Sequence, residues 1–205
     1  DFSSELITFN DMGRRVLIAA STRKGEEEKV LNAFRSVLEK EPSVILILVP
    51  RHPERFQDVA KLVSDLGFKF VRRSEGKELV KSTQVYLGDS MGELLAYYRL
   101  AHVAFVGGSL VDTGCQNVLE PAALGLPILV GPSQYNFAEI CSELENASAL
   151  RTINDAGELG DAFVDFLNDA AGWAQMGENG KKFVRKRQNI VSSTLRTLDK
   201  IYKVY

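Results

Sequence analysis

Residues 44–49 of the chain read VILILV, a run of six apolar residues that Pro50 ends. A continuous apolar run of this length is typical of a strand that is buried on both faces of a parallel sheet. The preceding segment, Gly25 to Lys40, carries apolar residues at helical spacing, and its first turn is acidic, which suits the helix dipole. The acidic residues are Glu26, Glu27 and Glu28, and the apolar ones are Val30, Leu31, Phe34, Val37 and Leu38. The stretch therefore predicts a helix followed by a buried strand.

The same alternation continues in both directions along the chain. Further strands are expected at 15–20, 68–72, 84–87, 102–106, 127–130 and 149–153. Further helices are expected at 55–66, 91–99, 117–124, 137–145, 156–170 and 172–204, the last with a break near Ser192 and Ser193. About six strands with helices on both faces predict an α/β fold with a Rossmann-like doubly wound parallel sheet. No linker or repeat divides the chain, so we expect one domain over residues 1–205.

The composition narrows the class of protein. The chain has 205 residues, of which 45% are hydrophobic and 25% charged, which is ordinary for a soluble globular protein and excludes collagen-like, disordered and disulfide-scaffold classes. A net charge of −2 argues against general nucleic-acid binding. Two cysteines favour a reducing compartment. Neither a signal peptide nor an apolar run near the ~18 residues of a membrane span is present.

Basic residues concentrate near the C-terminal end. Residues 181–205 hold eight Lys or Arg and one acidic residue, Asp199, a net charge of +7. Such a segment is usually a solvated helix face. The alternative is contact with an anionic surface, such as a membrane leaflet, or with a second domain.

Polar and glycine-rich segments follow four of the expected strands. They are Ser21–Gly25, Pro50–Arg55, Gly88–Glu93 and Gly107–Ser109. Ligands of open α/β sheets bind beyond the carboxyl ends of the strands, so we expect these loops to converge on one edge.

The first two loops allow a structural and a functional interpretation. Ser21 and Thr22 could cap the following helix, or could receive a phosphate with the free amides of a helix N-terminus. Pro50 and Pro53 could make a rigid turn around Arg51 and His52, or could present a clamp for an anion, because arginine offers a planar fork to phosphate. His52 alone gives little support for a general base.

The two later loops also allow both a structural and a functional interpretation. Ser90 and Glu93 match a capping box, yet Gly92 is a poor helix former and suits close approach of a ligand to the backbone. The spacing of Gly107 and Gly108 does not fit a dinucleotide fingerprint, although two glycines still permit close approach.

Asn117 and Glu120 also have box-like spacing. Glu120 could instead hold the two hydroxyls of a ribose. No metal-ligand spacing, G-x-S-x-G elbow or Walker loop occurs in the chain. The residues alone therefore predict an α/β domain for a phosphorylated or nucleotide-like ligand.

Four stretches resemble the 3-deoxy-D-manno-octulosonic acid (Kdo) transferases of Gram-negative bacteria, in the same order along nearly the whole chain. They are STRKGEEE (Ser21–Glu28), LVPRHPERF (Leu48–Phe56), LGDSMGEL (Leu87–Leu94) and AFVGGSLVDTGCQNVLEPAALGLPILVGPSQYNF (Ala104–Phe137). The resemblance implies a GT-B glycosyltransferase with two Rossmann-like domains, which transfers Kdo from CMP-Kdo to the lipid A precursor of lipopolysaccharide with inversion and without a metal or other cofactor. This chain corresponds to the C-terminal, donor-binding half.

The resemblance also implies a nucleotide pocket. Pro50 and Arg51 would contact the CMP moiety, with Glu120 as the ribose partner. The other implied contacts are Met91, Gly92, Glu93, Asn117, Val118 and Leu119, with Ser21, Thr22, His52 and Gly108 as secondary candidates. Cys115, Gln116 and Val118 depart from the glycine, histidine and proline that the family usually has, which leaves the role of the histidine position open.

The family places its catalytic base, a glutamate, together with the membrane anchor and the acceptor site in an N-terminal domain that this chain lacks. Asp1 would then mark a boundary within a longer protein. We therefore expect a soluble domain that binds the donor without turnover, from an enzyme at the cytoplasmic face of the inner membrane. The alternatives are a GT-B domain for a UDP-sugar, as in an epimerase or an N-acetylglucosaminyltransferase, and a non-catalytic interaction domain.

Overall fold

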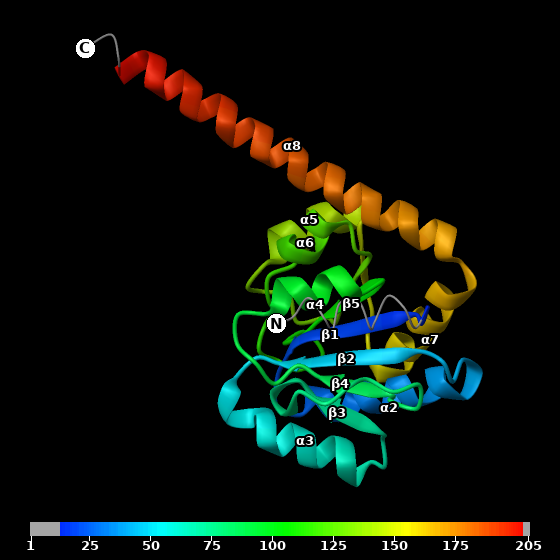
Figure 1. The fold of residues 1–205 in the computed structure, drawn as a ribbon. Helices are drawn as coiled ribbons and strands as arrows, with labels where there is room; N and C mark the ends of the chain where they lie inside the picture. Colours follow the sequence, from blue (N-terminus) through cyan, green and yellow to red (C-terminus); the bar gives the residue numbers. More distant parts are fainter. Residues whose placement is uncertain (1–12, 203–205) are drawn as a thin grey trace.

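Seven parallel strands form one sheet through the middle of the computed structural model, which describes residues 13–202, with side chains as far as Gln188 (Figure 1). The strands are β1 (Val16–Thr22), β2 (Ile45–Pro50), β3 (Phe70–Arg72), β4 (Val85–Leu87), β5 (Val103–Val106), β6 (Ile128–Val130) and β7 (Leu150–Thr152). Their order across the sheet is β3-β4-β2-β1-β5-β6-β7, and every neighbouring pair is parallel. All residues of β1 and β2 are buried, which confirms the prediction from VILILV.

Helices cover both faces of the sheet. One face packs against α2 (Glu26–Lys40), α3 (Phe56–Asp65) and α7 (Ala156–Asn168), and the other against α4 (Leu94–Leu100), α5 (Leu119–Leu124) and α6 (Ala138–Asn146). Alternate residues of β1 enter the two cores, with Leu17 and Ala19 on the first face and Ile18 and Ala20 on the second. The predicted doubly wound α/β architecture is therefore confirmed, and each of the seven expected strand ranges overlaps one strand of the sheet.

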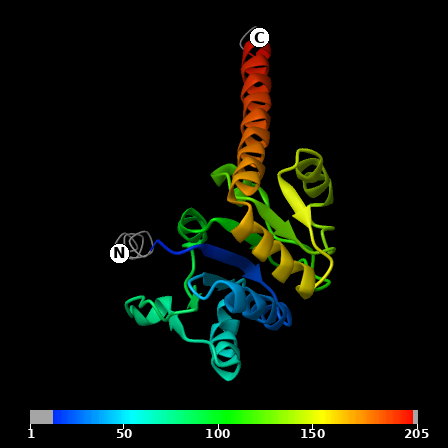
Figure 2. The ribbon, with the colours of Figure 1, turned by 90° about the vertical axis from the view of Figure 1, so that its right-hand side faces the viewer.

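The last helix, α8 (Ala170–Tyr202), starts beside α7, crosses α5 and projects beyond the sheet (Figures 1 and 2). Gly177 and Gly180 face α5 at the crossing. A Cβ at Gly177 would lie 2.0 Å from the carbonyl oxygen of Gly125, so this crossing requires a glycine. The expected break near Ser192 and Ser193 is wrong, because the helix is continuous there and the interruption lies at Asp169. The expected end of this helix, residues 203 and 204, lies outside the described residues.

Several helices begin later than the sequence predicted. α4 begins at Leu94 and not at Met91, and α5 begins at Leu119 and not at Asn117. Before α3, residues Pro53–Arg55 form a short 3₁₀ turn, η1, and Arg73–Glu75 form a second one, η2, after β3. The chain from β4 to α4 is therefore a loop, and the hydrogen bonds of α4 begin at the carbonyl of Glu93, which accepts the amide of Tyr97 at 3.1 Å.

The order of the strands reverses between β1 and β5. The chain leaves β1 into α2 on one face and leaves β5 into α5 on the other, so the topological switch point lies between the carboxyl ends of these two strands. This is the position at which open α/β sheets bind ligands. In the described part of the chain, no helix is both long and apolar enough to cross a membrane.

Candidate functional site

Ser21 and Thr22 form the end of β1. Ser21 is buried and adopts a left-handed backbone conformation, with φ of 57°, where the register between β1 and β2 shifts. The Thr22 hydroxyl donates to Oε1 of Glu27 over 2.9 Å. Gly25 occupies the N-cap position of α2 without a side-chain cap, so the interpretation of Ser21 and Thr22 as helix caps is wrong. A strained, buried serine at the reversal point is a feature that clusters at functional sites.

The glycine loop, residues 107–110, follows β5 and lies directly beside the end of β1. The amide of Gly107 donates to the carbonyl of Ala20, and a Cβ at residue 107 would lie 2.7 Å from the Cα of Thr22. Gly108 has φ of +80°, and a Cβ there would lie 2.3 Å from the carbonyl oxygen of Gly114. Both glycines are therefore required by close backbone approach. The approaching backbone belongs to the protein itself, so close approach of a ligand to these glycines stays a prediction.

The side chain of Glu26 holds the glycine loop, which the sequence analysis missed. Its Oε2 accepts the backbone amides of Arg23 at 3.0 Å and Gly108 at 2.7 Å. Its Oε1 accepts those of Ser109 at 3.1 Å and Leu110 at 2.9 Å. Glu26 is fully buried, and burial raises the pKa of its carboxyl although these amides oppose the shift. The first turn of α2 thus binds the loop through a carboxylate.

The loop after β2 presents Arg51 to solvent. Its backbone amide donates to the carbonyl of Thr22 at 3.0 Å, which fixes it beside β1, and its Nε donates to Oε1 of Gln116 at 3.3 Å. His52 is half-buried, with Nε2 at 2.5 Å from Nη1 of Arg23. Pro50 ends β2 and Pro53 begins η1, so the rigid turn is present and Arg51 also remains accessible to an anion.

The second arginine of this loop, Arg55, is not available to a ligand. It makes a bidentate ion pair with Glu27, whose side chain is 1% exposed, and one bond of the pair joins Nη2 to Oε2 at 2.9 Å. Adjacent carboxylates of α2 therefore brace two different loops of the edge.

The loop after β4 contains two carboxylates that are already paired. Asp89 accepts from Nε of Arg72 at 2.7 Å and from the amide and hydroxyl of Ser74. Burial opposes ionisation of Asp89, but these donors outweigh it and hold the pKa of its carboxyl below the usual range. The loop is thereby tied to the end of β3.

Glu93 does not form the predicted capping box. It occupies the N-cap position of α4, and its carboxylate accepts from Arg73, from the hydroxyl of Ser90 and from the hydroxyl of Tyr97. The bond from Ser90 therefore joins two side chains and caps no backbone amide. Burial opposes ionisation, and the bonds from Arg73 and Ser90 outweigh it, so that the pKa of Glu93 lies below its usual range.

Met91 and Gly92 form the exposed tip of this loop. The Met91 side chain is 60% exposed, and Gly92 has φ of +80° with open space where a Cβ would be. Gly92 is therefore required by its backbone conformation, and the space beside it is free.

Asn117 and Glu120 interact at the start of α5. Oδ1 of Asn117 accepts the amide of Leu119, and its Nδ2 donates to Oε1 of Glu120, both over 3.0 Å. In the described part of the chain, no hydrogen bond reaches the second carboxylate oxygen of Glu120. Val118 is fully buried in the core, so only its backbone can face a ligand. The predicted capping box is not formed, because Val118 is the N-cap of α5 and Glu120 bonds the side chain of Asn117, and one carboxylate oxygen remains for another donor.

A groove of about 830 Å³ opens beside Glu120. Its lining residues come from α4, from α5 and the loop before it, and from α8. They are Leu95, Arg99, Asn117, Leu119, Glu120, Ala123, Leu124, Val184, Arg187 and Gln188. Beneath it, burial and then the negative charge of Glu120 raise the pKa of the Tyr98 phenol. Arg51 reaches this neighbourhood through Gln116, the residue before Asn117.

The two cysteines lie close together in the core. Sγ of Cys115 is 3.7 Å from Sγ of Cys141, and both residues are fully buried. The amide of Cys115 donates to the carbonyl of Ser133 at 2.9 Å. Where the resemblance expects a glycine, Cys115 therefore fills space in the core beneath the loop.

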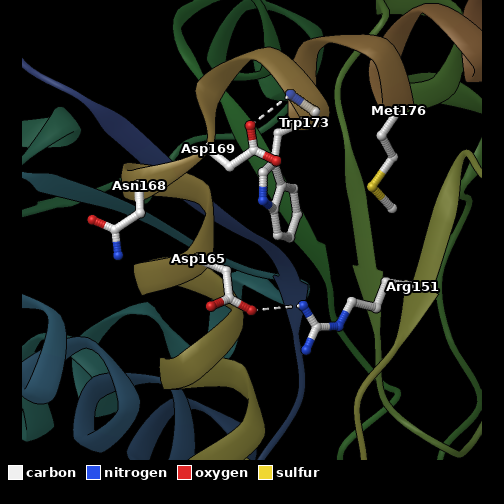
Figure 3. Close-up of a pocket in the computed structure, with 7 residues that line it drawn as sticks. Arg151, Asp165, Asn168, Asp169, Trp173 and Met176 are labelled. Carbon is white, nitrogen blue, oxygen red and sulfur yellow. Dashed lines mark hydrogen bonds and ion pairs between the residues drawn. The ribbon is translucent and has the colours of Figure 1, made fainter.

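A second cavity, of about 500 Å³, lies at the turn from α7 to α8 (Figure 3). Arg151 pairs there with Asp165 at 3.0 Å, and Asp169 accepts the amide of Gly172 at 3.0 Å, while Trp173 and Met176 form the apolar wall. Arg151 and Asp165 thus pair with each other, Asp169 accepts from the backbone of α8, and none of the predicted site residues lines the cavity.

Comparisons with known proteins identify the class. A family model described as "Glycosyl transferases group 1" matches residues 14–183. The chain therefore belongs to the group 1 glycosyl transferase family. Within that family the relatives that it matches include 3-deoxy-D-manno-octulosonic acid transferases. The protein from Haemophilus influenzae is 39% identical over 183 residues, which cover 89% of this chain and 43% of the relative. The protein from Bordetella pertussis is 35% identical over 191 residues, which cover 91% of this chain and 44% of the relative. The chain thus spans less than half the length of these relatives.

A solved structure supports the same family and is matched over nearly its whole length. The C-terminal CMP-Kdo binding domain of WaaA from Acinetobacter baumannii is 36% identical, with a TM-score of 0.79. The match covers 86% of this chain and 97% of that domain. The predicted family and the predicted C-terminal GT-B domain fold are therefore confirmed.

Proposed function

We propose that this chain is the donor-binding domain of a Kdo transferase, which transfers Kdo from CMP-Kdo to the lipid A precursor in lipopolysaccharide biosynthesis. The observation that carries the proposal is the similarity to the CMP-Kdo binding domain from Acinetobacter baumannii over 97% of that domain. The geometry supports it, because the accessible polar groups lie at the carboxyl edge, around the strand reversal.

Three residues supply the chemistry that such a nucleotide needs. Arg51 is exposed and offers a guanidinium fork to the phosphate of CMP. Glu120 is held by Asn117 through one oxygen and offers the other to the vicinal hydroxyls of the ribose. Gly92 leaves open space beside its backbone for close approach.

The remaining predicted contacts take supporting roles. Met91 is exposed at the loop tip and can cover an apolar face of the ligand, while Leu119 lines the groove beside Glu120. Pro50, Val118 and Glu93 act through backbone position, since their side chains are buried or already paired. The secondary candidates support the loops of the carboxyl edge and are not assigned a direct contact. They are Ser21, Thr22, His52 and Gly108.

Turnover needs groups beyond this chain. The catalytic base and the acceptor site belong, under this proposal, to the part of the relatives that the chain does not span. The isolated chain should bind CMP-Kdo without transferring Kdo. No metal or other cofactor takes part in the proposed binding.

Calorimetric titration of the chain with CMP, CDP, UMP and UDP tests the proposal. We expect CMP to bind and both uridine nucleotides to bind more weakly, with equal results in EDTA and in magnesium. Arg51→Ala and Glu120→Ala should each weaken CMP binding by about 1–3 kcal/mol. Arg151→Ala, at the other cavity, and Glu139→Ala, exposed on α6, are the charge-matched controls.

The other outcomes separate the alternatives. Preference for UDP would favour a UDP-sugar enzyme, and absence of all nucleotide binding would favour an interaction domain. Transfer of Kdo by the isolated chain would overturn the assignment of the base to another part of the enzyme.

The basic residues of α8 bear on where the complete enzyme lies in the cell. Lys182, Arg185 and Lys186 are exposed on α8, whereas Arg187 pairs with Glu143. We place the complete enzyme at the cytoplasmic face of the inner membrane, with this segment facing anionic lipid or the other domain. Sedimentation with vesicles of anionic and of neutral lipid separates lipid contact from a solvated helix face.

A further inference from the structure

We propose that Glu26 is a positioning residue of the nucleotide site, whose carboxylate sets the shape of the glycine loop and thereby the place of the residues that follow it. The inference rests on the proposed function. It concerns a side chain that touches no ligand, because Glu26 is fully buried and both of its oxygens are occupied by the protein.

The hydrogen bonds of Glu26 specify a carboxylate. Each oxygen accepts two backbone amides, one pair from Arg23 and Gly108 and the other from Ser109 and Leu110. A glutamine has one acceptor oxygen, and its amide group is a donor only. Whichever way a glutamine is turned, its NH₂ meets two N–H groups and leaves them buried without an acceptor, which is costly.

The surrounding contacts leave the loop little freedom to adjust. Nζ of Lys29, one turn along α2, donates to the carbonyl of Leu110 at 2.8 Å. A Cβ at Gly107 would lie 2.8 Å from Oε2 of Glu26, so the carboxylate and the loop backbone are in direct contact. The loop is thus bonded through its amides to Glu26 and through the carbonyl of Leu110 to Lys29, and its backbone at Gly107 packs against the Glu26 carboxylate.

The shape of this loop continues into the proposed contacts. The carbonyl of Gly107 accepts the amide of Gln116 at 3.0 Å, and Gln116 in turn accepts from Nε of Arg51. Asn117, the next residue, holds Glu120. A displacement of the glycine loop would therefore move both the phosphate fork and the ribose carboxylate.

Glu26→Gln tests the inference, and Glu28→Gln, exposed in the same helical turn, is the matched control. Phe166→Ala is a second control, because it removes core packing between α7 and Trp173 and no site contact. It separates loss of stability from loss of position. Each variant is titrated with CMP at a temperature where thermal unfolding shows it to be folded, and its amide resonances are recorded by ¹⁵N NMR.

We expect Glu26→Gln to weaken CMP binding at least about tenfold and to shift the amide protons of Gly108, Ser109 and Leu110 upfield. Glu28→Gln and Phe166→Ala should keep the affinity and these resonances of the unmodified chain. Unchanged CMP affinity in folded Glu26→Gln, or an equal loss in Phe166→Ala, would overturn the inference. If the unmodified chain fails to bind CMP, the proposed function fails instead, and the amide shifts still report whether Glu26 holds the loop.

Discussion

Nε of Arg51 donates a hydrogen bond to Oε1 of Gln116 over 3.3 Å, and this bond joins the loop after β2 to the loop after β5. The resemblance expects a histidine at position 116, and the glutamine found there contacts the guanidinium that we assign to the phosphate. The bond orients Arg51, which otherwise extends into solvent.

We expect Gln116→Ala to weaken CMP binding by about 0.5–1.5 kcal/mol, less than Arg51→Ala, because it removes one hydrogen bond and leaves the charge in place. Calorimetry measures the difference. Gln175→Ala, exposed on α8, is the matched control. An effect of Gln116→Ala equal to that of Arg51→Ala would mean that Gln116 itself contacts the nucleotide.

The ionised Asp89 should stabilise the fold at neutral pH. Because its pKa is depressed in the folded state, its contribution is present above the usual value of 3.8 and is lost as the pH falls below it. Asp89→Asn should lower the free energy of unfolding at pH 7 by about 1.5–3 kcal/mol and flatten the loss of stability below pH 4. Urea unfolding at several pH values measures both effects.

Asp58→Asn, exposed on α3, is the control for that measurement. The explanation fails if the acid limb of Asp89→Asn has the same slope as that of the unmodified chain.

The crossing of α8 over α5 should depend on one glycine. Gly177→Ala should destabilise the fold by about 1–3 kcal/mol, because its Cβ would overlap the carbonyl of Gly125 and force the helices apart. Gly180→Ala is a matched control on the same helix, where the nearest atom, the Cα of Ala122, would lie 3.4 Å from the new Cβ. It should be neutral or stabilise by up to about 1 kcal/mol, since alanine favours the helix. Equal effects of the two substitutions on urea unfolding would contradict the crossing described here.

The paired cysteines should be unreactive in the folded protein. Both are fully buried, and the hydrogen bond between them and their burial raise the pKa of the Cys141 thiol. We expect an aromatic disulfide reagent, which releases a coloured thiolate when it reacts with a thiol, to label neither cysteine in native buffer and both in denaturant. Rapid labelling of either cysteine in native buffer would show that the loop above them opens.

The strands were predictable because burial on both faces leaves an unbroken apolar run, as in β2 and β5. The starts of the helices were less predictable. Ser90 and Glu93 have the spacing of a capping box, but Glu93 pairs with Arg73 and α4 begins three residues later than predicted. The pair, Arg73 and Glu93, comes from two different loops, and local spacing does not reveal it.

The position of the candidate site at the carboxyl edge of the sheet was predictable, whereas the buried carboxylates that hold its loops were not. Parallel strands bring the loops together, and the residue types show which loops can bind an anion. Glu26 and Glu27 suit a helix dipole equally well whether they are exposed or buried. The available signal was their spacing of four residues from Val30 and Leu31, which places both glutamates on the apolar face of α2.

The carboxylate of Glu26 also affects where a negatively charged ligand can bind. Four converging backbone amides are a ready receptor for a phosphate in many α/β domains. In this domain that receptor is filled from within by a negative charge of the protein. Under the proposed function, the negative charge of Glu26 disfavours a phosphate at these amides, and exposed Arg51 is the group that we assign to it. If Arg51 binds the phosphate as proposed, the ion pair is exposed to solvent, and the affinity for nucleotide should fall as the ionic strength rises.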